Sequence, residues 1–406
     1  MSRAYIYMEH PDSGEILTLG RLTLQGRFGE FVYAPDYVER GNWVPDPINY
    51  PLRAEAYTGI AKNRGIPGFI NDAMPDGWGE RLLQRAFGQV LAPIEFLLKS
   101  PNNDRVGNLM AGTATAPAHG LGDSSVPTLK GLAKFIEACE AVYDGQLDEQ
   151  SVAMLNIRQQ RSSLGGARPK RTLQDHGMLI LAKPRDRFDQ YDFPAIEYAC
   201  MTFAASKGLN VAKTALHAET PSTLLIERFD RTPLAEGARR IPMLSALTLL
   251  DAEWNEQYHR DWRYAAVADE MRRRGVPDVD LQELFKRMCY NALAGNSDDH
   301  PRNHSIIWLA GQWRLSPMYD VLPIVDEGPA QTLAMAVGRD GNQISRGNML
   351  SHHSHFALTR EHAEHLLDEV IGWEEELKEY YAQWLQGEEL QMARAAVSSV
   401  RMRMRK

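Results

Sequence analysis

The sequence of 406 residues has few of the features that set unusual protein classes apart. It has only three cysteines, Cys139, Cys200 and Cys289, without the spacing of a metal site or a disulfide framework. Its formal net charge of −8 gives no basic field, which argues against broad nucleic-acid binding. No apolar run approaches the roughly 18 residues that cross a bilayer, and no charged-then-apolar signal opens the chain. These absences predict a cytoplasmic protein with no membrane partner.

The overall composition, 44% hydrophobic and 24% charged, is that of a globular protein, and the length suggests two or three domains. Residues 4–34 alternate apolar and polar side chains around the turn signals PDSG and QGRFG, which predicts a small antiparallel sheet. Residues 50–110 are mostly helical in pattern. Residues 111–128 are small, polar and rich in Pro and Gly, so we expect a linker and a domain boundary there.

The rest of the chain changes from mixed to helical character. Helices are predicted over 129–143 and 192–208 and strands over 177–184 and 222–231. From residue 243 onward helical patterns dominate, at 246–254, 262–275, 281–296 and 361–387. A β-rich part followed by a helical part indicates an α+β protein with two lobes.

The stretch GNSDDHPRNHSIIW at 295–308 concentrates polar side chains between a helix and a strand. Asp298 and Asn303 are five residues apart, and Asp320 follows after a predicted hairpin. This layout is typical of phosphoryl-transfer sites, where the first Asp orients the attacking hydroxyl and the Asn and second Asp hold Mg²⁺. A capped turn explains the same residues, because Asp, Asn and Ser satisfy loop backbone groups. The loop alone leaves both interpretations open.

Upstream residues favour phosphoryl transfer. RSSLGGARPK offers a Gly-containing loop over 165–170 with cationic donors, and Lys183 ends a predicted strand. Glu197 on the following helix is either a partner for Lys183 or a surface carboxylate. LLIERFDR resembles a hinge strand whose backbone at Glu227 to Phe229 could hydrogen-bond an adenine.

In this order, SSLGGARPK, ILAKP, LLIERFDR, GNSDDHPRNHSI and LSPMYDVLP resemble the HipA family of bacterial toxin kinases. GFINDAMPDGWGERLL and NDRVGNLM extend the resemblance, which runs from about residue 15 to 400. It implies an α+β, two-lobe, protein-kinase-like fold with a small N-terminal subdomain, a β-rich N-terminal lobe and an all-helical C-terminal lobe. The expected boundaries are an N-terminal subdomain at 1–112, a linker at 113–128, the N-lobe at 129–235 and the C-lobe at 236–406.

The resemblance also implies an activity and partners. The protein would be an ATP- and Mg²⁺-dependent serine/threonine protein kinase and the toxin of a type II toxin–antitoxin pair. Its partner would be a helix-turn-helix, HipB-like antitoxin, through which DNA is reached only indirectly. Its substrate would be a translation-related protein, an aminoacyl-tRNA synthetase by family resemblance, with growth arrest as the outcome.

The resemblance assigns roles to individual residues. Asp298 corresponds to the catalytic aspartate, Asn303 and Asp320 to the Mg²⁺ ligands, and Lys183 to the lysine that binds the nucleotide phosphates. Ser163 corresponds to a serine that is autophosphorylated as an off switch. The expected nucleotide-binding residues are Ser163, Leu164, Gly165, Gly166, Ala167, Arg168, Lys170, Lys183, Glu227 and Phe229.

Two features depart from the family pattern. Asp299 directly follows Asp298, so the catalytic acid is open to a shift by one residue, although the spacing to Asn303 favours Asp298. The stretch 245–275 matches the best-known members poorly.

Two other functions stay open. A small-molecule kinase of the aminoglycoside or choline type typically has a His two residues before the first Asp; this chain has Asn296 there, which argues against that type. A non-catalytic, DNA-associated co-repressor that acts with an antitoxin would keep the scaffold without turnover.

Two groups of side chains outside this constellation invite other interpretations. His352, His353, His355, His362 and His365 suggest a metal site, but no Cys or carboxylate pattern completes one, so a solvated helix end is favoured. The basic patches at 271–275 and 401–406 are expected to be solvated, with contact to DNA phosphates as the alternative.

Overall fold

The computed structural model describes residues 2–75, 77–118, 126–143, 169–217, 222–234, 237–254, 261–324 and 328–404. The chain divides into two compact units. The first contains Met1–Arg187 and Leu225–Leu244, and the second contains Phe188–Leu224 and Ser245–Lys406. The subdomain, linker and lobe boundaries expected from the sequence stay predictions. Among the described residues, no helix combines the length and apolar character needed to cross a membrane.

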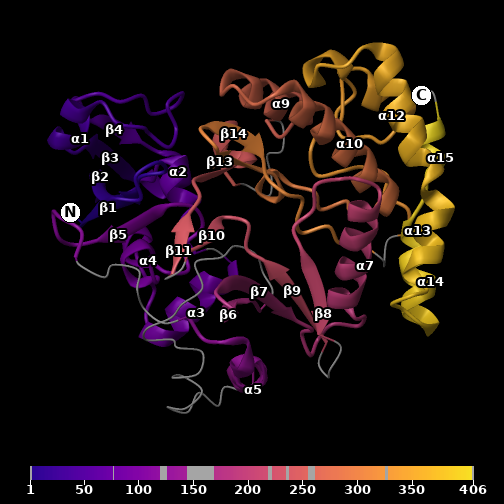
Figure 1. Cartoon of the computed structure of the whole chain (residues 1–406), viewed down its shortest axis with the longest axis horizontal. Helices are drawn as coiled ribbons and strands as arrows, with labels where there is room; N and C mark the ends of the chain where they lie inside the picture. The colour runs from indigo at the N-terminus through magenta and orange to yellow at the C-terminus, as the bar shows by residue number, and fades with distance from the viewer. Residues whose placement is uncertain are drawn as a thin grey trace. The chain divides into compact units, whose positions relative to one another are not determined.

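The first unit begins with a five-stranded antiparallel sheet of order β4-β3-β2-β1-β5 (Figure 1). Its strands are β1 (Ser2–Glu9), β2 (Ile16–Gln25), β3 (Phe28–Tyr33), β4 (Tyr57–Ile60) and β5 (Leu109–Gly112). The sheet expected over 4–34 is therefore confirmed. β4 and β5 were missed, because strands of four residues are too short to show a period of two.

The helices of the first unit lie between the later strands of this sheet and after it. They are α1 (Pro35–Arg40), α2 (Gly68–Asn71), α3 (Gly77–Phe87), α4 (Pro93–Lys99) and α5 (Leu132–Tyr143). Short 3₁₀ turns occupy Lys62–Gly65 and Leu129–Gly131. The helix expected at 129–143 thus begins with a 3₁₀ turn and becomes α-helical at Leu132.

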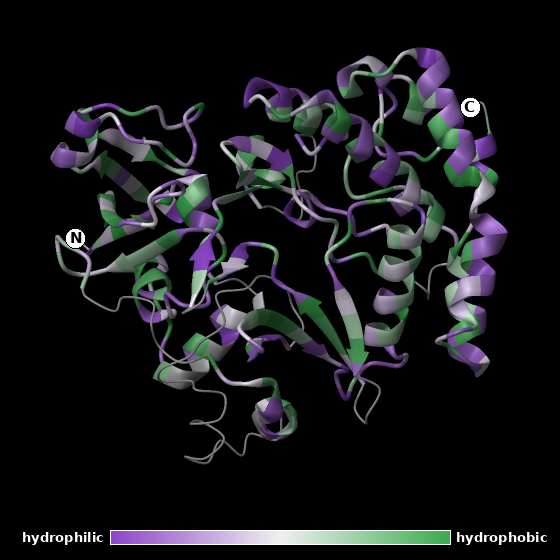
Figure 2. Ribbon diagram, viewed as in Figure 1, coloured by the Kyte–Doolittle hydropathy of each residue, from purple (hydrophilic) through white to green (hydrophobic). Residues whose placement is uncertain are grey.

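The remaining strands of the first unit include those predicted to bind nucleotide. They are β6 (Arg171–Asp175), β7 (Met178–Pro184), β9 (Thr223–Glu227, which runs across the boundary between the two units), β10 (Arg231–Pro233) and β11 (Ala238–Arg240). β6 and β7 form an antiparallel hairpin, and β10 pairs antiparallel with β11. The centre of β9, the residues LLI, is apolar, and much of this strand is green in Figure 2. The predicted strands 177–184 and 222–231 correspond to β7 and β9.

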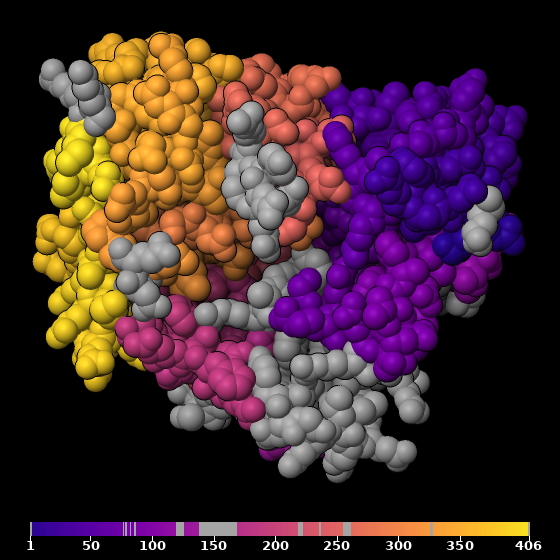
Figure 3. Space-filling model, turned by 180° about the vertical axis from the view of Figure 1, so that it is seen from behind, coloured from indigo at the N-terminus to yellow at the C-terminus, as the bar shows by residue number. Residues whose placement is uncertain are grey.

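The second unit is mainly helical. Its α-helices are α7 (Phe193–Ser206), α8 (Ala246–Leu249), α9 (Tyr264–Arg273), α10 (Asp278–Ala294), α11 (Arg346–Leu350), α12 (Arg360–Gly372), α13 (Glu374–Tyr381), α14 (Gly387–Ala396) and α15 (Val400–Arg403). Its 3₁₀ turns are Pro301–Asn303 and His353–Phe356. The C-terminal helices form the yellow surface in Figure 3.

Strands interrupt the helical part. They are β8 (Thr214–His217), β12 (Met243–Ser245, at the junction of the two units), β13 (Ser305–Leu309) and β14 (Gln312–Leu315). β13 and β14 form the predicted hairpin, with Ile306 opposite Leu315. The expectation of an all-helical C-terminal lobe is wrong at this hairpin, whose short apolar run SIIWL and alternating QWRL favour strands.

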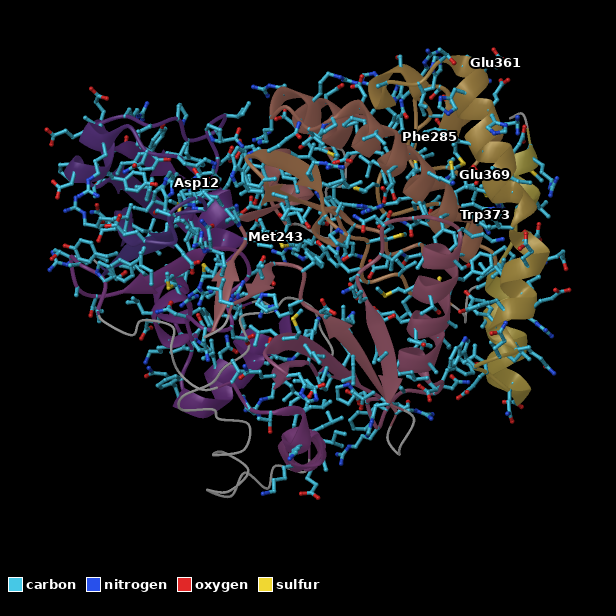
Figure 4. The ribbon with its side chains drawn as sticks, in the orientation of Figure 1. Asp12, Met243, Phe285, Glu361, Glu369 and Trp373 are labelled. Atoms are coloured by element: carbon cyan, nitrogen blue, oxygen red, sulfur yellow. The ribbon has the colours of Figure 1, made fainter. Side chains whose placement is uncertain are left out.

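α10 is the centre of the second unit, with twelve of its residues buried. It packs against α9 and α12, and Phe285 meets Phe356 edge to face at 5.4 Å. Glu369 and Trp373, labelled in Figure 4, lie against α10 through Lys286, whose Nζ is 2.9 Å from the Glu369 carboxylate. The single helix expected at 361–387 instead breaks at Trp373 into α12 and α13.

Candidate active site

The polar loop begins where α10 is forced to end. Gly295 adopts the left-handed conformation (φ 79°), and its N–H donates to the carbonyl of Asn291. A Cβ at this position would lie 2.7 Å from the carbonyl oxygen of Ala396. Both the backbone conformation and the close neighbour therefore require glycine, and they fix the direction in which the chain leaves the helix.

Asp299 anchors this loop in the protein interior. Its Oδ2 accepts a hydrogen bond from Asn291 Nδ2 at 2.7 Å, and its Oδ1 lies 2.9 Å from His304 Nε2. Asp299 is only 1% exposed, and Asn291 and His304 are equally buried. Asn296, also buried, donates to the side chain of Asn291 at 3.2 Å. Because both carboxylate oxygens are engaged inside the protein, Asp299 is poorly placed to receive a proton from a substrate.

Asp298, by contrast, is exposed. Its backbone carbonyl accepts hydrogen bonds from the His300 N–H at 2.8 Å and from Asn303 Nδ2 at 3.4 Å. These bonds fold the loop back on itself and bring Asn303 beside Asp298. Since Asn303 uses its amide N–H groups toward the loop, its amide oxygen is the atom suited to a cation. The geometry supports Asp298 over Asp299 as the catalytic candidate, and the assignment stays a prediction.

Tyr319, the residue before Asp320, is held to the same loop by hydroxyl groups. Tyr319 Oη donates to the carbonyl of Arg302 at 2.8 Å and lies 3.2 Å from Ser305 Oγ. Ser305 Oγ also donates to Ser316 Oγ at 2.9 Å. Asp320 itself has a positive φ of 60°, a conformation that costs energy outside glycine and is found at functional sites.

The charges of the loop interact. The pKa of Asp298 is raised above that of an ordinary aspartate by partial desolvation and by the nearby Asp320 carboxylate, and the positive charge of His300 opposes this rise. A divalent cation near Asp320 would relieve the repulsion between the two acids. The described residues contain no group of three His, Cys, Asp or Glu that could hold a metal alone. Asn303 and Asp320 nevertheless fit Mg²⁺, whose shell is completed by phosphate and water in such sites.

The predicted nucleotide-binding residues belong to the first unit where they are described. Lys183 is half-buried on β7, Lys170 is buried before β6, and Glu227 and Phe229 are half-buried at the end of β9. Ser163, Leu164, Gly165, Gly166, Ala167 and Arg168 lie outside the described residues. Glu197 on α7 is 5% exposed, so its interpretation as a surface carboxylate is wrong.

The supposed hinge LLIERFDR carries a buried charge network that the sequence did not reveal. Asp230 accepts two hydrogen bonds from Arg228, at 2.9 and 2.7 Å, and one from Arg231 Nη1 at 2.7 Å. It also accepts the backbone N–H of Gly107 at 2.9 Å. Arg228 further donates to the Asp104 carboxylate at 3.0 Å. The four charged residues of ERFDR were the available signal, but the other partners in the network, Asp104 and Gly107, lie more than 120 residues away.

The histidines and basic residues near the C-terminus form ordinary surface contacts. His355 Nδ1 lies 2.8 Å from Asp269, and the His352 and His355 rings are 5.2 Å apart. In the patch 271–275, Arg272 pairs with Asp269, while Arg273 and Arg274 pair with Glu270. Arg272 and Arg273 are exposed, which supports the solvated interpretation for these two residues, but the Arg274 side chain is buried, so that interpretation is wrong there.

Replacing Gly295 with alanine tests how tightly the loop is positioned. We expect Gly295→Ala to lower the free energy of unfolding by about 2–4 kcal/mol, from the left-handed backbone and the overlap with Ala396 together. Gly275→Ala is the matched control, because Gly275 has a φ of 75° but no atom within 4 Å of its Cβ position. It should cost only about 1 kcal/mol. Equal losses in urea unfolding of the two variants would contradict this account.

Comparison with known proteins shows what this chain resembles in sequence. Residues 162–376 match the family model described as the HipA-like C-terminal domain. The serine/threonine-protein kinase toxin HipA of Shewanella oneidensis is 25% identical over 203 residues. That alignment covers 44% of this chain and 47% of the relative, so it spans about half of either protein.

Solved structures extend the likeness. A chain in the complex of HipA, HipB and operator DNA from Shewanella oneidensis MR-1 matches with a TM-score of 0.69 and 17% identity, covering 96% of this chain and 94% of that one. The proinflammatory kinase CtkA of Helicobacter pylori matches with a TM-score of 0.44 and 12% identity over 57% of this chain and 86% of that one. The first match confirms the expected α+β, kinase-like fold.

Proposed function

This chain belongs to the HipA family, and we propose that it is a Mg²⁺- and ATP-dependent serine/threonine protein kinase, the toxin of a type II toxin–antitoxin pair. The observation that carries the proposal is the difference in surroundings between two adjacent acids. Asp299 is buried and fixes the loop, while Asp298 is exposed beside Asn303 and Asp320.

The chain's own groups would act as follows. Asp298 orients the acceptor hydroxyl and receives its proton as the oxygen attacks the γ-phosphorus. Asn303 and Asp320 hold Mg²⁺, which neutralises charge on the phosphates when bound. Lys183 and the loop Ser163–Lys170, with the backbone at Glu227 and Phe229, bind the nucleotide, as the order of the motifs predicts.

The substrate and partner follow from the family. We propose a translation-related acceptor, an aminoacyl-tRNA synthetase, whose phosphorylation arrests growth. We also propose a HipB-like helix-turn-helix antitoxin as partner, with DNA reached through it. The solved relative was crystallised with HipB and operator DNA, which supports this partner.

We also propose, from the family resemblance, that autophosphorylation of Ser163 switches the kinase off. Phosphate on Ser163 adds a charge of about −2 to the loop that is meant to bind ATP, and would repel or displace it.

Mass spectrometry after incubation with ATP and Mg²⁺ tests the function. We expect one phosphate on the peptide containing Ser163, none on that peptide in Ser163→Ala, and no transfer after Mg²⁺ is removed with EDTA. The protein is first treated with a phosphatase so that Ser163 begins unmodified. No phosphate on this chain or on any protein of a cell extract would overturn the kinase assignment in favour of a non-catalytic co-repressor. Transfer to an aminoglycoside or choline alone would favour a small-molecule kinase.

A further inference from the structure

His300 connects the two ends of the proposed catalytic loop. Its backbone N–H donates to the carbonyl of Asp298 at 2.8 Å, and its carbonyl accepts the N–H of Asn303 at 2.9 Å. A charged imidazole at this position also lowers the pKa of the Asp298 carboxyl, so the ring acts directly on the proposed proton acceptor. A displacement of His300 would therefore move both Asp298 and Asn303.

Trp254 holds the imidazole ring of His300. The two rings meet edge to face, with centres 4.7 Å apart and planes at 87°. Nδ1 of His300 is buried and has no hydrogen-bond partner among the described residues. Because this nitrogen makes no hydrogen bond, aromatic packing against Trp254 is what restrains the ring. Trp254 also lies 4.6 Å from the guanidinium of Arg302, the residue before Asn303.

Trp254 itself rests on a buried residue. Its ring lies 5.2 Å from that of Trp262, which is 2% exposed. The carbonyl of Trp262 accepts the N–H of Ala336 at 2.8 Å, and the N–H of Tyr264 donates to the carbonyl of Ala336 at 3.1 Å. The ring of Tyr264, fully buried, is centred 5.4 Å from that of His304. One short segment thus supports the catalytic loop twice, directly through Tyr264 and indirectly through Trp254.

We propose that Trp254 is a positioning residue of the kinase: its indole, resting on Trp262, holds His300 and thereby fixes Asp298 for proton transfer. This inference rests on the proposed kinase function and adds a residue that lies outside the motifs of the active site. Trp254 belongs to the stretch 245–275, which departs from the family pattern. Because a misplacement of about 1 Å can slow a reaction about a hundredfold, a contact behind the loop is enough to affect turnover.

The dependence of autophosphorylation on ATP concentration tests this role. Phosphatase-treated protein is incubated with Mg²⁺ and increasing ATP, and the rate of phosphate incorporation is fitted to a maximal rate and a half-saturating ATP concentration. We expect Trp254→Leu to lower the maximal rate by about 10–100-fold and to change the half-saturating concentration by less than about twofold. Trp254→Phe keeps an aromatic ring at this position and should recover the rate to within about threefold of the wild type.

Trp384 provides the matched control. Its ring meets that of Tyr198 edge to face, with centres 4.7 Å apart and planes at 85°, in the same unit as Trp254. This contact joins α7 to the chain after α13 rather than to the catalytic loop. Trp384→Leu removes the same kind of contact, and we expect it to keep the maximal rate within about twofold. Urea unfolding of both leucine variants measures how much stability each loses.

Combination with Asp298→Asn shows whether Trp254 acts through Asp298. In the Asp298→Asn background, Trp254→Leu should lower the rate by less than about threefold, because the side chain that it misplaces no longer accepts a proton. A further loss of about tenfold or more would overturn the inference. Where the double variant is too slow to measure, the ATP dependence and the recovery in Trp254→Phe decide the matter.

The outcomes that overturn the inference differ from those that overturn the function. A Trp254→Leu enzyme with the wild-type maximal rate would overturn the inference and leave the kinase standing. So would an equal loss of rate in Trp384→Leu, because the effect would then come from general destabilisation. A wild type that transfers phosphate neither to itself nor to any protein of a cell extract would overturn both.

Discussion

Replacing Asp298 with asparagine is expected to slow phosphoryl transfer by about 10²–10⁴-fold, the usual contribution of a positioned proton acceptor. The amide cannot accept the hydroxyl proton, although it keeps the shape of the side chain. Because the Asp298 side chain is exposed, the free energy of unfolding should change by less than about 0.5 kcal/mol. Single-turnover rates at saturating ATP and Mg²⁺, with urea unfolding of the same preparation, measure both quantities.

The neighbouring acid provides the contrast. Asp299→Asn would present an N–H₂ group to one of its two present donors, Asn291 or His304, and leave a buried bond unmade. We expect it to lower the free energy of unfolding by about 1–3 kcal/mol. One result would exchange the two assignments. In it, Asp298→Asn would keep more than a tenth of the transfer rate, while Asp299→Asn would lose the transfer rate but keep its free energy of unfolding.

The pH dependence offers a second check on Asp298. Its carboxylate must be ionised to accept a proton, and its pKa is raised above the ordinary value near 4 by partial desolvation and by Asp320. The value of kcat/KM should therefore fall as the pH drops through this raised pKa, at a higher pH than for an unperturbed aspartate. Asp298→Asn should lack this acidic limb in its residual activity.

The sequence predicted those parts of this site whose residues lie close together along the chain. Asp298 and Asn303 share one loop, and Asp320 follows a hairpin that is visible in the apolar run of SIIWL and the alternation of QWRL. The long helix α10 was expected for the same reason, since its apolar residues recur at helical spacing.

The roles of individual loop residues could not be predicted in this way. Asp298 and Asp299 are identical letters, and only the positions of Asn291 and His304 determine that the second is buried. Trp254 precedes the catalytic loop by more than forty residues, so its contacts with His300 and Arg302 are a product of the tertiary fold. Neither periodicity nor turn chemistry encodes such pairings.

Replacing Asp230 with asparagine is expected to lower the free energy of unfolding by about 3–5 kcal/mol, the cost of breaking a buried ion pair from one side. Asp230 accepts hydrogen bonds from Arg228, Arg231 and Gly107. Burial alone would raise its pKa, but the two guanidinium groups outweigh burial and hold the pKa below the ordinary range. An amide in its place leaves two buried cations without their shared counter-charge.

Comparison with an exposed ion pair isolates the effect of burial. Arg21 and Glu30 lie 3.6 Å apart in the same unit, with each side chain 42% exposed. Glu30→Gln removes one acid, as Asp230→Asn does, but it should cost less than about 1 kcal/mol. Urea unfolding at pH 7 lies above the unfolded pKa of aspartate, where a depressed folded pKa contributes its full stabilisation. A loss of under 1 kcal/mol for Asp230→Asn would mean that water reaches the arginines. The charge network would then not stabilise the end of β9.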